Sequence, residues 1–163
     1  MDSLLLALTW ISALGAALIA GVFFGFSTFV MTALGHRPPA EGIAAMQEIN
    51  TVVVRSGFIA VFFATAVTSA ALAVFALMRW DDPRAVYWLA GAIFYVVGTF
   101  VLTIVCNVPL NDKLAAVDPA STEGASVWSS YLADWTWWNS VRTGASLVAT
   151  AAFILALRSP SAA

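Results

Sequence analysis

Three long stretches of the chain contain no charged side chain. Residues 3–35, 56–78 and 85–111 have no Asp, Glu, Lys or Arg. A helix of roughly 20 apolar residues crosses the hydrocarbon core of a bilayer, and each stretch reaches that length. Only 10% of all residues are charged, whereas an ordinary soluble domain has about a quarter. We therefore predict an all-α integral membrane protein whose surroundings are the lipid bilayer.

Charge and cysteine content exclude several other classes of function. The formal net charge is −2, and nucleic-acid binding requires a basic patch, so no nucleic-acid partner is expected. The single cysteine, Cys106, excludes a disulfide framework within the chain and a zinc site built from cysteines.

The apolar stretches and the polar segments between them predict a four-helix transmembrane bundle. We expect it to form one domain over residues 1–163. The predicted helices cover about residues 4–34, 52–78, 85–108 and 138–157. Lys and Arg favour cytoplasmic loops, and their distribution leads us to expect a cell-membrane protein with both termini in the cytoplasm.

The two long connections differ in character. The first contains Ile43, Met46 and Ile49 at helical spacing, which predicts a short amphipathic helix within residues 36–51. The second, residues 111–137, is rich in aromatic side chains and is expected to be a loop. With four spans, both long connections lie at the same face of the membrane.

Polar side chains gather at that end of the bundle. The uncharged part of the fourth span, residues 143–157, is too short to cross a bilayer alone. The helix must therefore extend back through Arg142 and Asn139, which places both at or just inside the membrane boundary. The polar residues expected at this end are His36, Asn50, Arg55, Asn107, Asn111, Asp112, Asn139 and Arg142.

Ionisable groups inside a membrane are costly and usually face a cavity or a partner. Arg142 shares a helix face with Asn139 and with Trp135. Asn107 and Asn111 flank a proline that cannot donate a backbone hydrogen bond, so this segment is either an unwound helix that lines a cavity or an ordinary helix end. We favour a pocket over side chains that only anchor the bundle to lipid headgroups.

Two further patterns concern packing and metals. Ala17, Gly21 and Gly25 repeat every four residues, and Gly91 and Gly98 are seven apart, spacings that let membrane helices approach closely. These small-residue faces also allow a homo-oligomer.

A soft-metal site from His36, Met46 and Cys106 is conceivable. No pair of residues has a metal-ligand spacing, however, and we expect no metal site.

Several segments carry a family resemblance. They are Gly25-Phe-Ser27 followed by Met31 and a His-x-Pro turn, Met46-Gln-Glu-Ile-Asn50, Asn107-Val-Pro-Leu-Asn-Asp112, and Trp135-Thr-Trp-Trp-Asn139-Ser-Val-Arg142-Thr. Together they resemble the anthrone oxygenase-like family of small four-helix membrane proteins. The resemblance implies a monooxygenase of polyketide tailoring that converts an anthrone to an anthraquinone with O2 and without a recognised metal or flavin.

On this hypothesis the ligands are O2 and a planar hydrophobic molecule, an anthrone-like polycyclic phenol. Asp112 or His36 would remove a proton, and Arg142 would stabilise the resulting oxyanion, so these three residues are the catalytic candidates. The substrate-binding candidates are Asn50, Arg55, Asn107, Asn111, Trp135 and Asn139. The alternatives are a non-enzymatic membrane subunit, a lipid- or quinone-binding protein, and a transporter-like protein that uses the same polar end.

Overall fold

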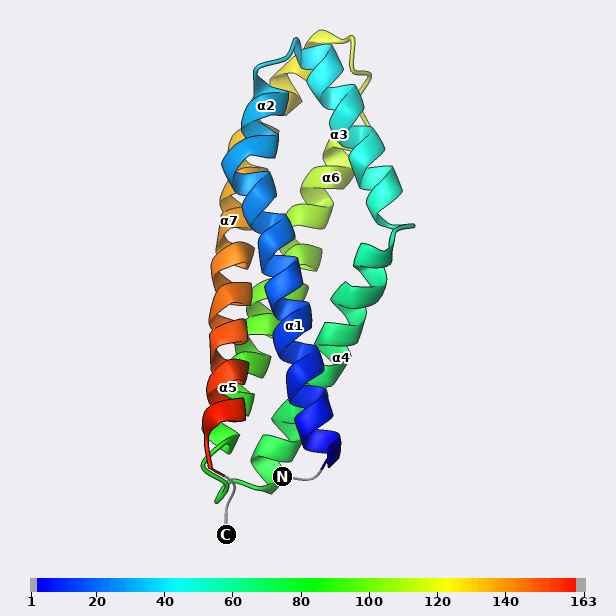
Figure 1. The fold of residues 1–163 in the computed structure, drawn as a ribbon. Coiled ribbons are helices and arrows are strands. Elements are labelled where there is room, and N and C mark those ends of the chain that lie inside the picture. Colours follow the sequence, from blue (N-terminus) through cyan, green and yellow to red (C-terminus); the bar gives the residue numbers. More distant parts are fainter. Residues whose placement is uncertain (1–2, 161–163) are drawn as a thin grey trace.

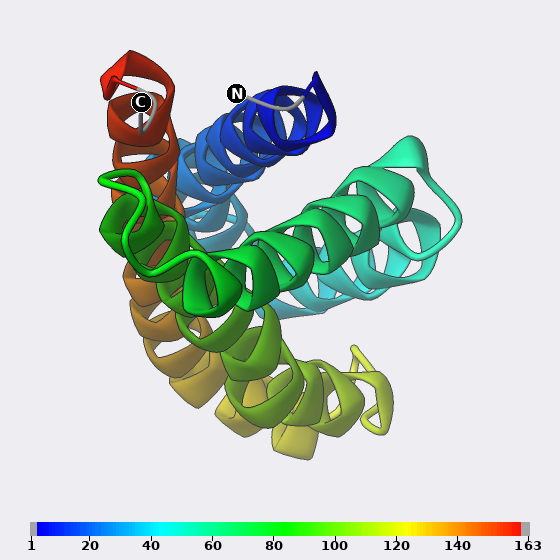
Figure 2. The same ribbon diagram turned by 90° about the horizontal axis from the view of Figure 1, so that it is seen from below.

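The computed structural model describes residues 3–160, and four long helical rods make up the bundle (Figures 1 and 2). Each rod is long and apolar enough to cross a membrane. The four rods are Ser3–Gly35, Gly57–Met78, Ala85–Ala115 and Thr122–Arg158. The all-α, four-helix transmembrane architecture predicted from the sequence is confirmed, and the chain is a multi-pass membrane protein.

The first rod consists of α1 (Ser3–Gly25), the π-helical turn η1 (Phe26–Val30) and α2 (Met31–Gly35). A short turn leads to α3 (Pro39–Val53), which begins with a proline in its first turn, where the missing N–H costs nothing. The amphipathic helix expected in the first long connection is therefore present. Its apolar face is buried at Ile43 and Met46.

The second span, α4 (Gly57–Met78), begins five residues later than predicted. Residues 52–53 end α3 instead, because Ser56 caps α4: its hydroxyl oxygen accepts a hydrogen bond of 3.2 Å from the Phe58 N–H. The chain thus bends between α3 and α4, and the two helices together form one side of the bundle (Figure 1).

The third rod continues past the predicted end at residue 108. It comprises α5 (Ala85–Tyr95), η2 (Val96–Val101), η3 (Thr103–Asn107) and α6 (Val108–Ala115). The segment from Asn107 to Asn111 neither unwinds nor ends the helix, contrary to both readings of the sequence. Pro109 lies in the first turn of α6, directly after π-helical η3, a position where the helix tolerates proline.

The fourth rod is one continuous helix, α7 (Thr122–Arg158). Most of the second long connection, expected to be a loop, is its N-terminal half. Ser121 caps this helix by accepting a 2.9 Å hydrogen bond from the Gly124 N–H. Trp128, Tyr131 and Trp135 are spaced at three and four residues and face inward, so these aromatics form a buried helix face and not a lipid-facing belt.

Two apolar clusters fill the bundle. The larger one joins α1, α4, α5 and α7 around Phe62, Trp88 and Phe153. The smaller one joins α2, α3, α6 and α7 around Met46, Trp128 and Trp135. Because the two clusters follow one another along the bundle, the space where they meet is bounded by helices from both.

Small residues bring the third and fourth rods close together, as predicted for Gly91 and Gly98. A Cβ built on Gly91 would lie 2.5 Å from a ring carbon of Phe153, and one on Gly98 would lie 2.8 Å from the Cβ of Ala145. The stripe on the first span behaves differently: Ala17 and Gly21 are exposed. That stripe faces outward and does not pack within the chain.

A buried ion pair closes the tight turn between α4 and α5, at the other end of the bundle. Asp82 accepts hydrogen bonds from the Arg84 backbone N–H (2.9 Å) and from its Nε (2.8 Å). The Arg84 guanidinium beside Asp82 holds the pKa of that carboxyl below its usual value. Asp82 and Arg84 are therefore paired with each other and stabilise the turn.

We predict that Gly91→Ala lowers the free energy of unfolding by about 1 to 3 kcal/mol, because the added methyl must displace the Phe153 ring. Gly144→Ala is the matched control, since nothing lies within 4 Å of a Cβ at that position. Both are measured by SDS titration in mixed micelles. Equal effects of the two substitutions would contradict the close approach at Gly91.

Candidate functional site

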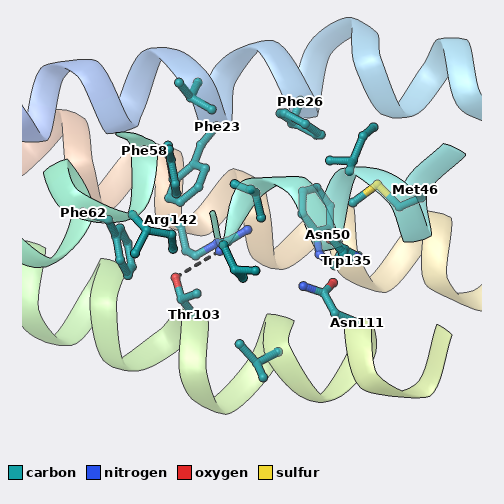
Figure 3. A pocket seen from close by; sticks show the side chains of 16 residues that line it. Phe23, Phe26, Met46, Asn50, Phe58, Phe62, Thr103, Asn111, Trp135 and Arg142 are labelled. Carbon is teal, nitrogen blue, oxygen red and sulfur yellow. Dashed lines mark hydrogen bonds between the residues drawn. The ribbon is translucent and has the colours of Figure 1, made fainter. Parts of the chain in front are cut away.

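A cavity of about 160 Å³ lies where the two apolar clusters meet (Figure 3). Its walls are mainly aromatic and aliphatic and come from all four rods and α3. The lining residues are Val22, Phe23, Phe26, Met46, Ile49, Asn50, Val53, Val54, Phe58, Ile59, Phe62, Thr103, Val108, Asn111, Trp135 and Arg142. Val54 and Val108 are themselves exposed, so the cavity opens between the α3–α4 bend and α6.

Among residues 3–160, Arg142 is the one charged side chain that lines the cavity. It is 3% exposed, and its guanidinium donates hydrogen bonds to Thr103 Oγ1 (3.0 Å) and Asn139 Oδ1 (2.8 Å). The guanidinium carbon lies 4.2 Å from the ring centre of Phe23 and 5.4 Å from that of Trp135. Of its five N–H groups, these bonds use two, and Nε has no partner among the described residues.

No carboxylate within residues 3–160 forms an ion pair with this guanidinium. Removing an ion from water costs several kcal/mol even after the protein relaxes, and hydrogen bonds to neutral groups recover part of that cost. Aromatic faces add cation–π attraction, about 2 kcal/mol when desolvated. An anionic ligand in the cavity would supply the missing counter-charge.

Asn139 fixes the guanidinium in place. Its Nδ2 donates to the Phe23 carbonyl (2.6 Å) and to Ser27 Oγ (2.7 Å), which leaves Oδ1 directed at Arg142. Asn139 is fully buried but does not line the cavity. In the structure it hydrogen-bonds Arg142 from behind the cavity wall.

The π-helical turns occur beside these groups. Ser27, which accepts from Asn139, lies in η1, and Thr103 and Asn107 are the first and last residues of η3. In such turns the backbone ladder changes from i→i−4 to i→i−5 bonding, and π-bulges are frequent at functional sites. Here η3 supplies Thr103, which bonds Arg142, and η1 supplies Ser27, which bonds Asn139.

Trp135 forms one wall of the cavity in an aromatic stack. Its ring lies 5.8 Å from that of Phe26 and 6.0 Å from that of Tyr131. Asn107, which is 1% exposed and lies outside the cavity lining, donates from Nδ2 to the Trp135 carbonyl (3.2 Å). Like Asn139, Asn107 thus holds a cavity residue.

Asn50 and Asn111 provide the remaining amides in the cavity wall. The Tyr131 hydroxyl donates to Asn111 Oδ1 at 2.8 Å. Both asparagines also border an outer groove whose wall contains Asp112. The cavity and the groove therefore share part of one wall.

The other three candidates lie outside the cavity. Asp112 is exposed and reaches only the outer groove. His36 is exposed and borders a separate depression beside Leu132 and Thr136. Arg55 is exposed in the bend between α3 and α4 and is not part of the cavity wall.

Several contributing residues were not singled out from the sequence. Tyr131 precedes Trp135 by four residues and so shares its helix face, which is the signal that could have found it. Thr103 gave no signal, because one hydroxyl in an apolar span usually bonds its own backbone. Ser27 belongs to a segment that carries the family resemblance but was given no role. Phe58 and Phe62 resembled any other lipid-facing residues.

Within residues 3–160, no three His, Cys, Asp or Glu side chains form a group that could hold a metal ion. Of the soft-metal ligands considered, Met46 lines the cavity, whereas His36 borders the separate outer depression.

Fold and site together define a multi-pass four-helix membrane protein with a cavity whose cation forms no ion pair with a carboxylate of residues 3–160. The family model for anthrone oxygenase matches residues 52–152, more than half of the chain. The protein belongs to the anthrone oxygenase family. The matched region includes Asn107, Asn111, Trp135, Asn139 and Arg142. No curated protein and no solved structure matches the chain.

We predict that Asn139→Leu lowers the free energy of unfolding by about 2 to 3 kcal/mol, because it leaves buried polar partners of Asn139 unsatisfied. The double variant with Arg142→Met removes the charge as well and should recover much of the loss. Ser130→Ala, at an exposed hydroxyl of the same helix that bonds the Val127 carbonyl, is the control. SDS titration in mixed micelles measures these variants, the Arg142→Met single variant and the wild type. Additive losses in the double variant would contradict the coupling of Asn139 to Arg142.

Proposed function

We propose that the protein oxygenates an anthrone-like polycyclic phenol to the corresponding quinone with O2, by forming a substrate anion next to Arg142. Membership of the anthrone oxygenase family supports an oxygenase-like function. The observation that carries the proposal is the buried guanidinium, which faces an aromatic cavity and has no carboxylate partner among residues 3–160.

The cavity suits a flat aromatic ring. The rings of Phe23, Phe58 and Phe62 follow one another along one side, with centres 5.8 to 5.9 Å apart. Trp135 stands on the other side of the Arg142 head group (Figure 3). An apolar cavity of about 150 Å³ accepts benzene, so one ring of the fused system fits inside, and the rest extends toward the opening at Val54 and Val108.

The first chemical step is loss of a proton from the activated CH2 of the anthrone. The electron pair moves to the carbonyl oxygen and gives an enolate-like oxyanion. Arg142 supplies a fixed positive charge to that oxygen, and such charges act most strongly in a site that excludes water. The carbanion character at the former CH2 is what reacts with O2.

The anion then reduces O2 while a C–O bond forms, and protonation gives a hydroperoxide. Loss of the second C–H proton with cleavage of the O–O bond releases water and leaves a carbonyl. The sum is anthrone plus O2 to anthraquinone plus water. Each oxidising equivalent comes from O2, and each electron from the substrate.

Asp112 is the better-placed proton acceptor of the two candidates. Its groove shares Asn50, Val54, Val108 and Asn111 with the cavity wall, so water at the opening can carry a proton to it. His36 borders a depression with no residue in common with the cavity. Proton transfer through one water is within the range of general bases.

We predict that the purified protein in detergent consumes O2 and produces anthraquinone absorbance when supplied with anthrone. Arg142→Met should lower kcat/KM by about 100-fold or more, because it removes the charge that stabilises the oxyanion. Asp112→Asn should lower kcat more than KM, by roughly 100-fold. His36→Ala should stay within about threefold of the wild type.

Absence of turnover in the wild type, with anthrone still bound, would overturn the oxygenase proposal in favour of a binding protein. Turnover that Arg142→Met leaves unchanged would overturn the proposed site. A rate that depends on His36 and not on Asp112 would place the proton path at the other depression.

A further inference from the structure

The cavity has polar groups at two separate places along its length. Thr103, which holds the Arg142 guanidinium, and Asn111 lie on the same rod eight residues apart, with most of the π-helical η3 between them. Figure 3 shows Arg142 and Thr103 toward the Phe62 end, and Asn50 and Asn111 toward the Met46 end. The oxyanion chemistry at Arg142 makes no use of the second pair.

Tyr131 orients the amide of Asn111. Its hydroxyl donates to Oδ1 at 2.8 Å, so the amide oxygen is occupied and the two N–H groups of Nδ2 remain available as donors. The tyrosine itself is 2% exposed. Its ring stacks between Trp128 (5.7 Å, 16°) and Trp135 (6.0 Å, 22°), which fixes the position of the hydroxyl.

We propose that Asn111, together with Asn50, forms a second oxygen-binding subsite, with Tyr131 as its positioning residue. The ligand class is then a planar aromatic with an acidic oxygen at the Arg142 end and a second acceptor oxygen at the far end of its long axis. This inference rests on the proposed function, because the cavity must hold the substrate. It adds a requirement on where the substrate carries its oxygens.

The size of the expected preference follows from the position of the subsite. A fully buried donor left unsatisfied costs about 1–3 kcal/mol, but Asn50 and Asn111 also border the outer groove, where water can replace a missing ligand oxygen. The second oxygen therefore gains only the net value of a neutral hydrogen bond, about a three- to tenfold increase in affinity.

The test uses three small probes and the full-length protein in detergent under argon, with binding measured by equilibrium dialysis. Naphthalene-2,6-diol has oxygens at both ends of its long axis, naphthalene-2,3-diol has both at one end, and 2-naphthol has one. The wild type should bind the 2,6-diol about three- to tenfold more tightly than 2-naphthol. The 2,3-diol should show no such gain.

Asn111→Leu and Tyr131→Phe should each abolish the preference for the 2,6-diol. Tyr131→Phe retains the stacked ring, so it removes only the hydroxyl that orients the amide. Tyr87→Phe removes a tyrosine hydroxyl near the other end of the bundle and should keep the preference. Arg142→Met should weaken all three probes.

Equal binding of the two diols, a preference that survives Asn111→Leu, or no binding of any probe would each overturn the subsite. A preference that persists in Tyr131→Phe would overturn its positioning role. Turnover of anthrone is measured separately in the same preparation. If the protein turns over anthrone but shows no preference for the 2,6-diol, the subsite proposal fails and the oxygenase proposal stands. If it shows the preference but no turnover, the oxygenase proposal fails and the subsite stands.

Discussion

The site depends on a positive charge that the protein buries without a carboxylate partner among the described residues. Arg142 contacts an amide, a hydroxyl and two aromatic rings, none of which neutralises it. A carboxylate at the same place would stabilise the bundle and would also occupy the donors that an anionic ligand needs. The arrangement therefore gives up stability in the free protein in exchange for attraction to an anion in the cavity.

A buried guanidinium without a carboxylate partner must be held in position by its neighbours. Here it is held by side chains that do not themselves line the cavity. Asn139 is held by the backbone of the first rod and in turn holds Arg142. Asn107 bonds the backbone at Trp135. These two amides are predicted to bind the substrate; in the structure they lie behind the cavity wall and hydrogen-bond the groups that line it. A charge stabilises an oxyanion most strongly when packed neighbours hold it in a fixed position.

The sequence predicted the number and nature of the spans because long uncharged runs leave few alternatives in a membrane. The end of α4 at Met78 and the start of α5 at Ala85 match the prediction to the residue. The N-terminal half of α7 was missed because polar and aromatic residues alternate there, which lowers hydropathy although one face is buried. High hydropathy identifies helices that are exposed to lipid. The N-terminal half of α7 packs against α3 and α6 instead.

Residue type and depth in the bundle also brought the polar candidates to one end, but they do not give the rotation of each helix about its axis. Asn50, Asn111, Trp135 and Arg142 line the cavity, whereas Asp112, next to Asn111 in the sequence, turns outward into the groove. Neighbouring residues on a helix are separated by 100° of rotation, so one position decides whether a side chain meets the ligand or water. That one-residue step puts an amide donor inside the cavity and a proton acceptor just outside it. A carboxylate inside would pair with Arg142, so the division keeps the cation free and still leaves a route for the proton.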